Sequence, residues 1–320
     1  MAEAPAATPL AGVTAPQVAT RTLVFALLRQ DGTVDAGELH AVADALGMTG
    51  QQVRLCVKRL VAEGRFTRQG RGRKAVLRAT ADPTGAIAPD AEYVRHAYRQ
   101  DHGLAPWDET WHLFAFAIPE TARHARDSLR DTLIHLGAAP LQGGLYVSAN
   151  AIGPIVEAHA RHLGVMPFLT SLTSRDLRLG DEDDPARLAA RLWPLDTIAE
   201  RHEELAALAA ARLDRLTRAA RPTTNERLTY AVELAAAFTT AMRPDPLLPP
   251  ELLPQPWPGT RARALTAQCW KALAAENEHR QDRSDLKLFR LYDDALTDTP
   301  GQDAKPADDQ GESPDGGHGG

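Results

Sequence analysis

The feature that most constrains the fold of this chain is a pair of predicted helix N-terminal caps, one before and one after a glycine. Asp35 with Glu38, and Thr49 with Gln52, each place a capping residue three positions before a side chain that can cap in return, which is a signature of helix N-termini. Gly47 interrupts the apolar helical pattern between them. The sequence therefore predicts two helices joined by a tight turn, as in a helix-turn-helix.

The second of these helices has one apolar and one polar side. Its apolar residues recur at helical spacing and predict contact with the core: Val53, Cys56, Val57, Leu60 and Val61. The polar side suits the major groove of DNA, because glutamine and arginine match adenine and guanine edges. Leu55 either meets a thymine methyl group or is an incidental surface leucine. The DNA-binding residues predicted here are Thr49, Gln51, Gln52, Arg54, Leu55, Lys58 and Arg59.

A basic hairpin follows this helix. Residues 65–77 hold two short β-prone pieces around a tip rich in glycine and arginine, a pattern typical of a wing. The wing would lie along the phosphate backbone or reach the minor groove, and its predicted contacts are Arg68, Arg71, Arg73 and Lys74. With an apolar helix over 19–29 in front, residues 18–80 predict a winged helix-turn-helix.

The charge distribution also favours a nucleic-acid partner. Residues 49–78 contain nine basic side chains and one acid, Glu63, so they carry +8, whereas the rest of the chain carries −14 within a net charge of −6. Nucleic-acid-binding proteins concentrate positive charge where phosphates lie. Charge alone also fits an ordinary solvated basic face.

Residues 105–178 predict a second domain of a different class. Strands and helices follow in the order βαββαβ, which is the ferredoxin-like split motif. The expected elements are strand 111–118, helix 120–136, hairpin 138–148, helix 154–163 and strand 165–172. Residues 81–104 are expected to form a linker that contains a helix over 91–100.

The alanine-rich remainder predicts an all-helical effector and dimerisation domain over 185–298. A helix capped by Asn225 is expected, whereas prolines exclude a helix over 244–259 and leave Trp257 as the anchor of that segment. The lead-in 1–17 and the acidic tail 299–320 are expected to be disordered. The fold class is therefore α+β with several domains.

Composition excludes several classes of protein. Apolar runs are far shorter than the ~20 residues that cross a bilayer, and residues 1–16 lack the basic start and apolar stretch of a secretion signal. Cys56 and Cys269 lie far apart, which fits neither a disulfide framework nor a thiolate metal site. We expect a cytoplasmic protein without membrane contact.

No catalytic motif is apparent, so we expect no enzyme activity, cofactor or bound metal. The sequence has no P-loop, G-x-G-x-x-G, G-x-S-x-G or H-E-x-x-H pattern. Glu120 follows the first strand of 105–178, but it fits a charge at a helix N-terminus better than a metal ligand. His159 and His162 could form half of a metal site, and no third ligand has suitable spacing.

Three stretches of the chain resemble the PaaX-like regulators, a family named for the repressor of phenylacetic acid catabolism. They are the winged helix ending in 68–77, the segments 116–120, 126–130 and 136–148, and the proline-rich motif 245–254 that continues in 257–259. The resemblance implies a homodimeric repressor with a winged-helix domain, a middle ferredoxin-like domain similar to the CRISPR-associated adaptation nucleases, and a helical C-terminal domain.

The resemblance also implies release from DNA by an aryl-CoA thioester, which is phenylacetyl-CoA in the best-known members. The chain departs from the family at Ala138 and Ala139, where Phe-Gly is common, and in its alanine-rich C-terminal helices. The candidate effector-binding residues are Arg123, Arg126, Arg130 and Trp257. The three arginines lie on one expected helix and could hold CoA phosphates. Because Asp127 and Asp131 alternate with them, such arginines more often form a solvated face with i, i+4 ion pairs.

The mechanism we predict is that of a repressor of a catabolic or secondary-metabolic operon. A homodimer would place two recognition helices about one helical turn apart on an inverted repeat in double-stranded operator DNA. The effector would favour a dimer with a different spacing. Two other functions stay open: a CoA-thioester sensor that acts through a protein partner, and a metal-dependent nuclease that uses the fold of residues 105–178.

Overall fold

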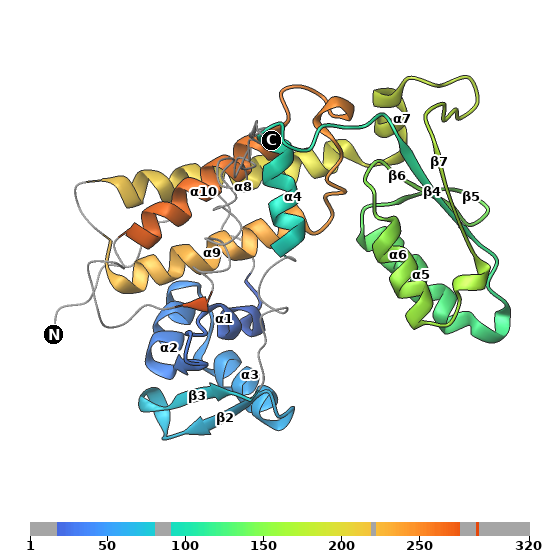
Figure 1. Cartoon of the computed structure of the whole chain (residues 1–320). Helices are drawn as coiled ribbons and strands as arrows, with labels where there is room; N and C mark the ends of the chain where they lie inside the picture. Colours follow the sequence, from blue (N-terminus) through green and yellow to red (C-terminus); the bar gives the residue numbers. More distant parts are fainter. Residues whose placement is uncertain (1–17, 81–90, 219–221, 276–285, 288–320) are drawn as a thin grey trace, which may run out of the picture.

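The computed structural model describes residues 18–80, 91–218, 222–275 and 286–287. Figure 1 shows three parts: an N-terminal unit (residues 18–80), a layer of long helices above it, and a middle domain (residues 105–178) at one end of that layer. The disorder expected for 1–17 and 299–320 lies outside the described residues. Within the described part of the chain, no helix combines the length and the apolar character that crossing a membrane requires.

The N-terminal unit packs three helices against a small antiparallel sheet. The helices are α1 (Thr20–Ala26), α2 (Ala36–Ala45) and α3 (Gly50–Ala62), and the strands are β1 (Thr33–Asp35), β2 (Phe66–Gln69) and β3 (Val76–Ala79). The strand order is β1-β3-β2. We did not expect β1, which immediately precedes α2 and pairs with β3, the second strand of the hairpin and the central strand of the sheet.

Local capping explains where α2 and α3 begin. The backbone N–H of Glu38 donates to the Asp35 carboxylate at 2.9 Å, and both hydrogen bonds of the Thr49–Gln52 capping box are formed. One prediction for α3 is wrong: Val61 was placed in the buried stripe but is 37% exposed. At 100° per residue Val61 lies about 80° around the helix from Val53, at the edge of the stripe rather than within it.

The middle domain has a four-stranded antiparallel sheet in the order β5-β6-β4-β7. Its strands are β4 (Trp111–Phe116), β5 (Ala139–Gln142), β6 (Leu145–Ser148) and β7 (Leu169–Ser174), and its helices are α5 (Arg123–His135) and α6 (Gly153–His162). The first and third strands are central, as in the predicted ferredoxin-like motif. The last strand begins at Leu169 rather than Val165, because Met166–Phe168 forms a 3-10 turn that contains Pro167.

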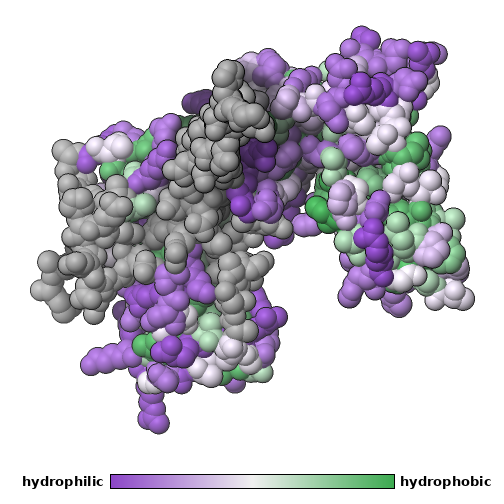
Figure 2. Space-filling view, viewed as in Figure 1, coloured by the Kyte–Doolittle hydropathy of each residue, from purple (hydrophilic) through white to green (hydrophobic). Residues whose placement is uncertain are grey.

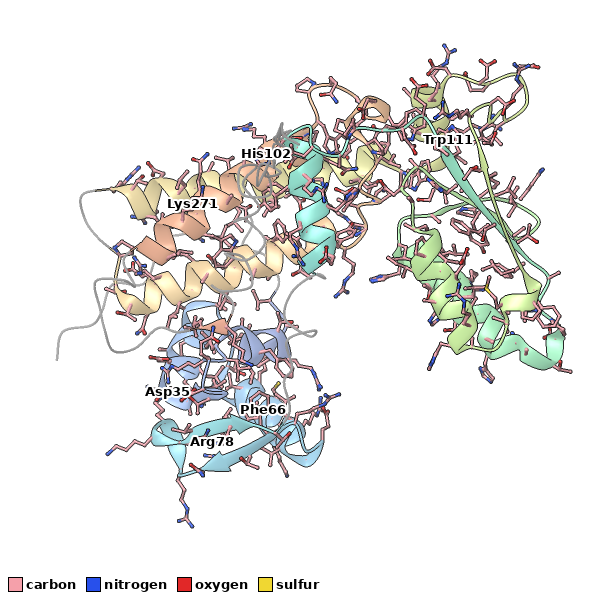
Figure 3. The ribbon with its side chains drawn as sticks, in the orientation of Figure 1. Asp35, Phe66, Arg78, His102, Trp111 and Lys271 are labelled. Atoms are coloured by element: carbon pink, nitrogen blue, oxygen red, sulfur yellow. The ribbon has the colours of Figure 1, made fainter. Side chains whose placement is uncertain are left out.

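The two faces of this sheet have separate cores. Phe114 and Tyr146 point toward α5 and α6 and pack with Leu129 and Val156. Residues of the opposite face pack with α7 (Pro185–Leu192), with the start of α8 (Leu195–Thr217) and with the proline-rich segment. Figure 3 shows Trp111 at the end of β4 that lies near α7. Helices that follow the middle domain in sequence therefore complete its core.

The helical layer contains α4 (Ala91–Asp101), α8, α9 (Thr224–Met242) and α10 (Pro258–Ala275). Although we expected α4 to lie in a linker, Val94, Ala97 and Tyr98 are buried in the same core as α9. The N-cap of α9 is Thr223, which forms a capping box with Glu226, and not Asn225 as predicted. The proline-rich segment is free of α-helix from residue 244 to residue 257, with a 3-10 turn at Pro250–Leu252. The prediction extended too far by two residues, because α10 begins at Pro258 and proline is tolerated in the first turn of a helix.

The N-terminal unit shares one continuous core with the helical layer. Buried residues of α1, including Leu23 and Phe25, belong to the same apolar cluster as Phe238 and Met242 of α9. Leu286 is buried in this cluster as well, and it forms an antiparallel bridge with Arg29. The N-terminal unit is therefore fixed to α9 by apolar packing and is not merely tethered to it.

Replacement of the fully buried Phe238 by alanine tests this shared core. We expect Phe238→Ala to lower the free energy of unfolding by about 3–5 kcal/mol, because it leaves a cavity in a packed interior. Urea unfolding followed by far-UV circular dichroism measures the change. The matched control is Thr240→Ala, at an exposed position of the same helix, which should change stability by less than about 0.5 kcal/mol. Equal effects of the two substitutions would contradict the assignment.

Candidate nucleic-acid interface

One side of α3 is open to solvent along its whole length. Exposed side chains on this side are Gln51, Arg54, Leu55, Lys58 and Arg59, and Leu55 is 49% exposed. Val53 and Leu60 anchor the opposite side in the core. The apolar stripe therefore orients the helix so that its polar residues are presented outward, which is what groove reading requires.

Two of the predicted DNA-binding residues have a structural task at the start of α3. The Gln52 side-chain oxygen accepts hydrogen bonds from the Thr49 backbone N–H at 2.7 Å and from the Thr49 hydroxyl at 3.0 Å. The Thr49 hydroxyl in turn accepts from the Gln52 backbone N–H at 3.2 Å. Both side chains remain exposed, but their first role is to begin the helix.

The wing places four more cations beside α3. Arg68 lies on β2, whereas Arg71, Arg73 and Lys74 lie at the tip, and all four are exposed. Gly70 allows the tight turn, because its φ of +84° suits glycine and a Cβ there would lie 3.3 Å from the Lys74 carbonyl oxygen. Long hydrophilic side chains project from this end of the N-terminal unit in Figure 2. We call these four residues and the five exposed residues of α3 the basic surface.

His40 of α2 was missed by the sequence analysis and shows that the two parts of the basic surface converge. Its pKa is lowered, first by burial and then by the positive charges of Arg73, Arg54 and Arg68, while Asp44 partly opposes them. These arginines come from the wing tip, from α3 and from β2. The half-buried imidazole of His40 therefore interacts electrostatically with arginines from all three elements. The only sequence signal was its position on the helix before the glycine turn.

The ion pairs within the basic surface are too few to neutralise it. Arg73 approaches Asp44 at 3.4 Å, with both side chains more than half exposed, and such pairs contribute little free energy. The arrangement combines unneutralised positive charge with amide and guanidinium groups on an outward-facing helix. It is suited to attracting phosphates and to donating hydrogen bonds to base edges.

The candidate effector residues do not converge. Arg126 pairs with Glu120 at 2.7 Å, and Arg130 pairs with Asp131 at 3.0 Å. Arg123 approaches Asp127 at 3.7 Å. The arginines lie on α5, which covers one face of the middle sheet. Trp257 is buried in the core against the other face, with its ring 6.1 Å from that of His202.

A groove of ≈ 430 Å³ lies between α5 and the end of α9. A shallow hollow of ≈ 640 Å³ along α5 adjoins it, and the two share Asp131 and His135. The α5 side also contributes His124 and Asp127, and the end of α9 contributes Arg243. Acidic side chains are as prominent as basic ones here, so the groove is not an evident site for the phosphates of CoA.

Residues that could have suggested a nuclease have other partners. Glu120 forms its ion pair with Arg126, as above, and the hydroxyl of Ser128 lies 3.1 Å from His159 Nε2. The rings of His159 and His162 stack with their centroids 6.5 Å apart. Across the described ranges, no three His, Cys, Asp or Glu side chains are grouped closely enough to hold a metal ion.

The pKa of His40 tests the geometry of the basic surface without DNA. We expect Arg73→Ala to raise the pKa of His40, because it removes a nearby positive charge that disfavours the imidazolium form. Titration of the His40 ring signals by NMR measures the shift. Arg161→Ala, the same charge change on α6, is the control and should leave this pKa unchanged. A pKa of His40 that does not respond to Arg73→Ala would place the wing tip away from α2.

The family models that match this chain cover its middle and C-terminal parts. Residues 104–188 match the "PaaX protein central Cas2-like domain", and residues 193–281 match the "PaaX-like protein C-terminal domain". No curated protein matches the chain. A similar solved structure is the uncharacterized protein Rv0674 from Mycobacterium tuberculosis, with 23% identity, a TM-score of 0.47, and coverage of 82% of this chain and 96% of that chain.

Proposed function

Since this chain belongs to the PaaX-like family, known as transcriptional regulators, we propose that it is a repressor that binds operator DNA through the basic surface. Residues 18–80 act as a winged helix-turn-helix in this proposal. The observation that carries it is the convergence of α3 and the wing around His40. A structural role would not need unneutralised cations from three elements on one exposed side.

Each part of the basic surface has its own task. The first two turns of α3 enter the major groove, where Gln51 and Arg54 read base edges. Lys58 and Arg59 contact phosphates one turn further on, and the wing arginines hold the backbone or enter the minor groove. A homodimer presents two such units to an inverted repeat whose half-sites are a whole number of helical turns apart.

An aryl-CoA thioester such as phenylacetyl-CoA is the proposed effector, and the protein acts without catalysis. The effector is expected from the family to which the chain belongs. It lowers operator affinity only to the extent that it binds the DNA-free arrangement more tightly than the DNA-bound one. The contact of α9 with the N-terminal unit supports such coupling, because α9 ends at the groove beside the middle domain.

Fluorescence anisotropy on DNA from upstream of the chain's own gene tests the proposal. We expect tight, salt-sensitive binding that phenylacetyl-CoA reverses and that free CoA, the matched control, leaves unchanged. Specific binding that no aryl-CoA thioester affects would support the role as a DNA-binding regulator and contradict the proposed effector. Absence of specific binding on any upstream fragment would overturn the proposal and favour a sensor that acts through a protein partner.

Two alanine substitutions separate base reading from phosphate contact. Arg54→Ala should reduce discrimination between operator and unrelated DNA by about 1–3 kcal/mol. Arg73→Ala should weaken binding to all DNA alike and reduce the log–log salt slope by about one. Arg161→Ala on α6 is the control for loss of one positive charge. Competition binding at several salt concentrations measures both effects, and identical behaviour of the first two variants would refute the division of roles.

A further inference from the structure

The tip of the wing lies along one face of α2. Gly37, His40 and Asp44 share this face, because positions three and four apart are neighbours on a helix. A Cβ at Gly37 would lie only 3.1 Å from the carbonyl oxygen of Arg73, and the Arg73 guanidinium approaches Asp44 at 3.4 Å. Arg73 therefore extends past His40 from one end of this face to the other.

Three arginines and one acid act on the half-buried ring of His40. Burial is the largest cause that lowers its pKa, and the positive charge of Arg73 comes next. Arg54 of α3 and Arg68 of β2 lower the pKa further, whereas Asp44 of α2 raises it. The free protein therefore releases the His40 proton at a lower pH than it would from an exposed histidine.

The other neighbours of α2 meet different sides of the helix. Arg29, which follows α1, forms an ion pair with Glu38, and Glu38 lies about 200° around the helix from His40. Helix α9 packs on the buried side that contains Leu39. Strand β1 leads directly into α2 and ends in its N-terminal capping residue. The positive charges that face His40 are therefore those of the basic surface.

A bound polyanion would act on the His40 ring in the opposite sense. Phosphates that pair with the three arginines offset the charges that disfavour protonation, and their own negative charge favours the imidazolium form. The pKa of His40 is then higher in a complex with DNA than in the free protein. Because linkage between two ligands is reciprocal, a group whose pKa rises on binding takes up a proton and strengthens that binding.

We propose that His40 couples DNA binding to pH, so that the complex takes up a proton at this residue and DNA affinity rises as the pH falls. The stabilisation of the complex is fully present below the pKa of His40 in the free protein. It is lost as the pH rises through the higher pKa of the complex. The inference rests on the proposed function, because DNA is the polyanion, and it adds a form of regulation that does not involve the effector.

Calorimetry of the unchanged full chain with duplex DNA from upstream of its own gene tests the coupling. Titrations in two buffers that differ in their enthalpy of ionisation count the protons taken up on binding. We expect uptake of a fraction of one proton at about pH 6.5, where histidine titrates, and almost none at about pH 8. This measurement needs no substitution, so it does not depend on the folding of a variant.

A pair of histidine variants identifies the group that takes up the proton. Between about pH 8 and about pH 5.5 the unchanged chain should bind DNA about three- to tenfold more tightly, which corresponds to a rise of about half to one pKa unit. His40→Gln should lose this tightening, because glutamine stays neutral at both pH values. The matched control is His124→Gln, at an exposed position of α5, which should retain it. Far-UV circular dichroism at both pH values checks that each variant is folded.

The outcomes separate this coupling from the proposed function. DNA binding without proton uptake, or a folded His40→Gln variant that keeps the full pH dependence, would overturn the coupling and leave the proposed function in place. Absence of DNA binding at every pH would overturn both. Proton uptake that His40→Gln abolishes and His124→Gln retains would establish His40 as the coupled group.

Discussion

A buried ion pair holds together the parts on which the rest of the structure depends. Arg263 of α10 donates to both carboxylate oxygens of Asp101 at the end of α4, at 2.6 and 2.7 Å. It also lies 3.6 Å from Asp245, whose carboxylate is 2.7 Å from His202 of α8. Burial alone lowers the pKa of Arg263, but these acids raise it overall. Removing one partner of such a pair typically costs about 3–5 kcal/mol, so α4, α8, α10 and the proline-rich segment constrain one another.

The middle domain is fixed to this same segment. The Asn150 side-chain amide donates to the carbonyls of Pro246 and Leu247 at 3.1 and 2.9 Å. Gly137 lies so close that a Cβ there would be 2.8 Å from Pro246. On its other side the segment continues from α9, which shares its core with residues 18–80. The proline-rich segment is therefore one link between the middle domain and the part of the core that carries the basic surface, and a relative movement of the two has to shift these contacts.

Much of the candidate site was predictable because its determinants are local. The caps at Asp35 and Thr49 act over three residues, and the wing follows from closely spaced glycines and arginines. His40 escaped prediction because only the packing of α3, β2 and the hairpin tip around α2 brings three arginines near it. Trp257 was correctly identified as an anchor, but its location was not predictable. It is buried in the same apolar cluster as Trp111, which is far away in the sequence, and this cluster lies on the face of the sheet opposite α5.

The sequence by itself determined the caps of α2 and α3, the βαββαβ order, the hairpin after α3 and most of the segment that cannot be helical. Each depends on spacing, periodicity or backbone chemistry within a few residues. Only the tertiary structure decided that α4 belongs to the helical layer, that α7 completes the sheet of the middle domain, and that α9 carries residues 18–80. The Tyr93 hydroxyl donates to the Met242 carbonyl across 149 residues of chain at 3.0 Å. Apolar periodicity predicts that a face is buried but not which surface buries it, because apolar packing is non-directional and its partner is chosen by the shape of the whole fold.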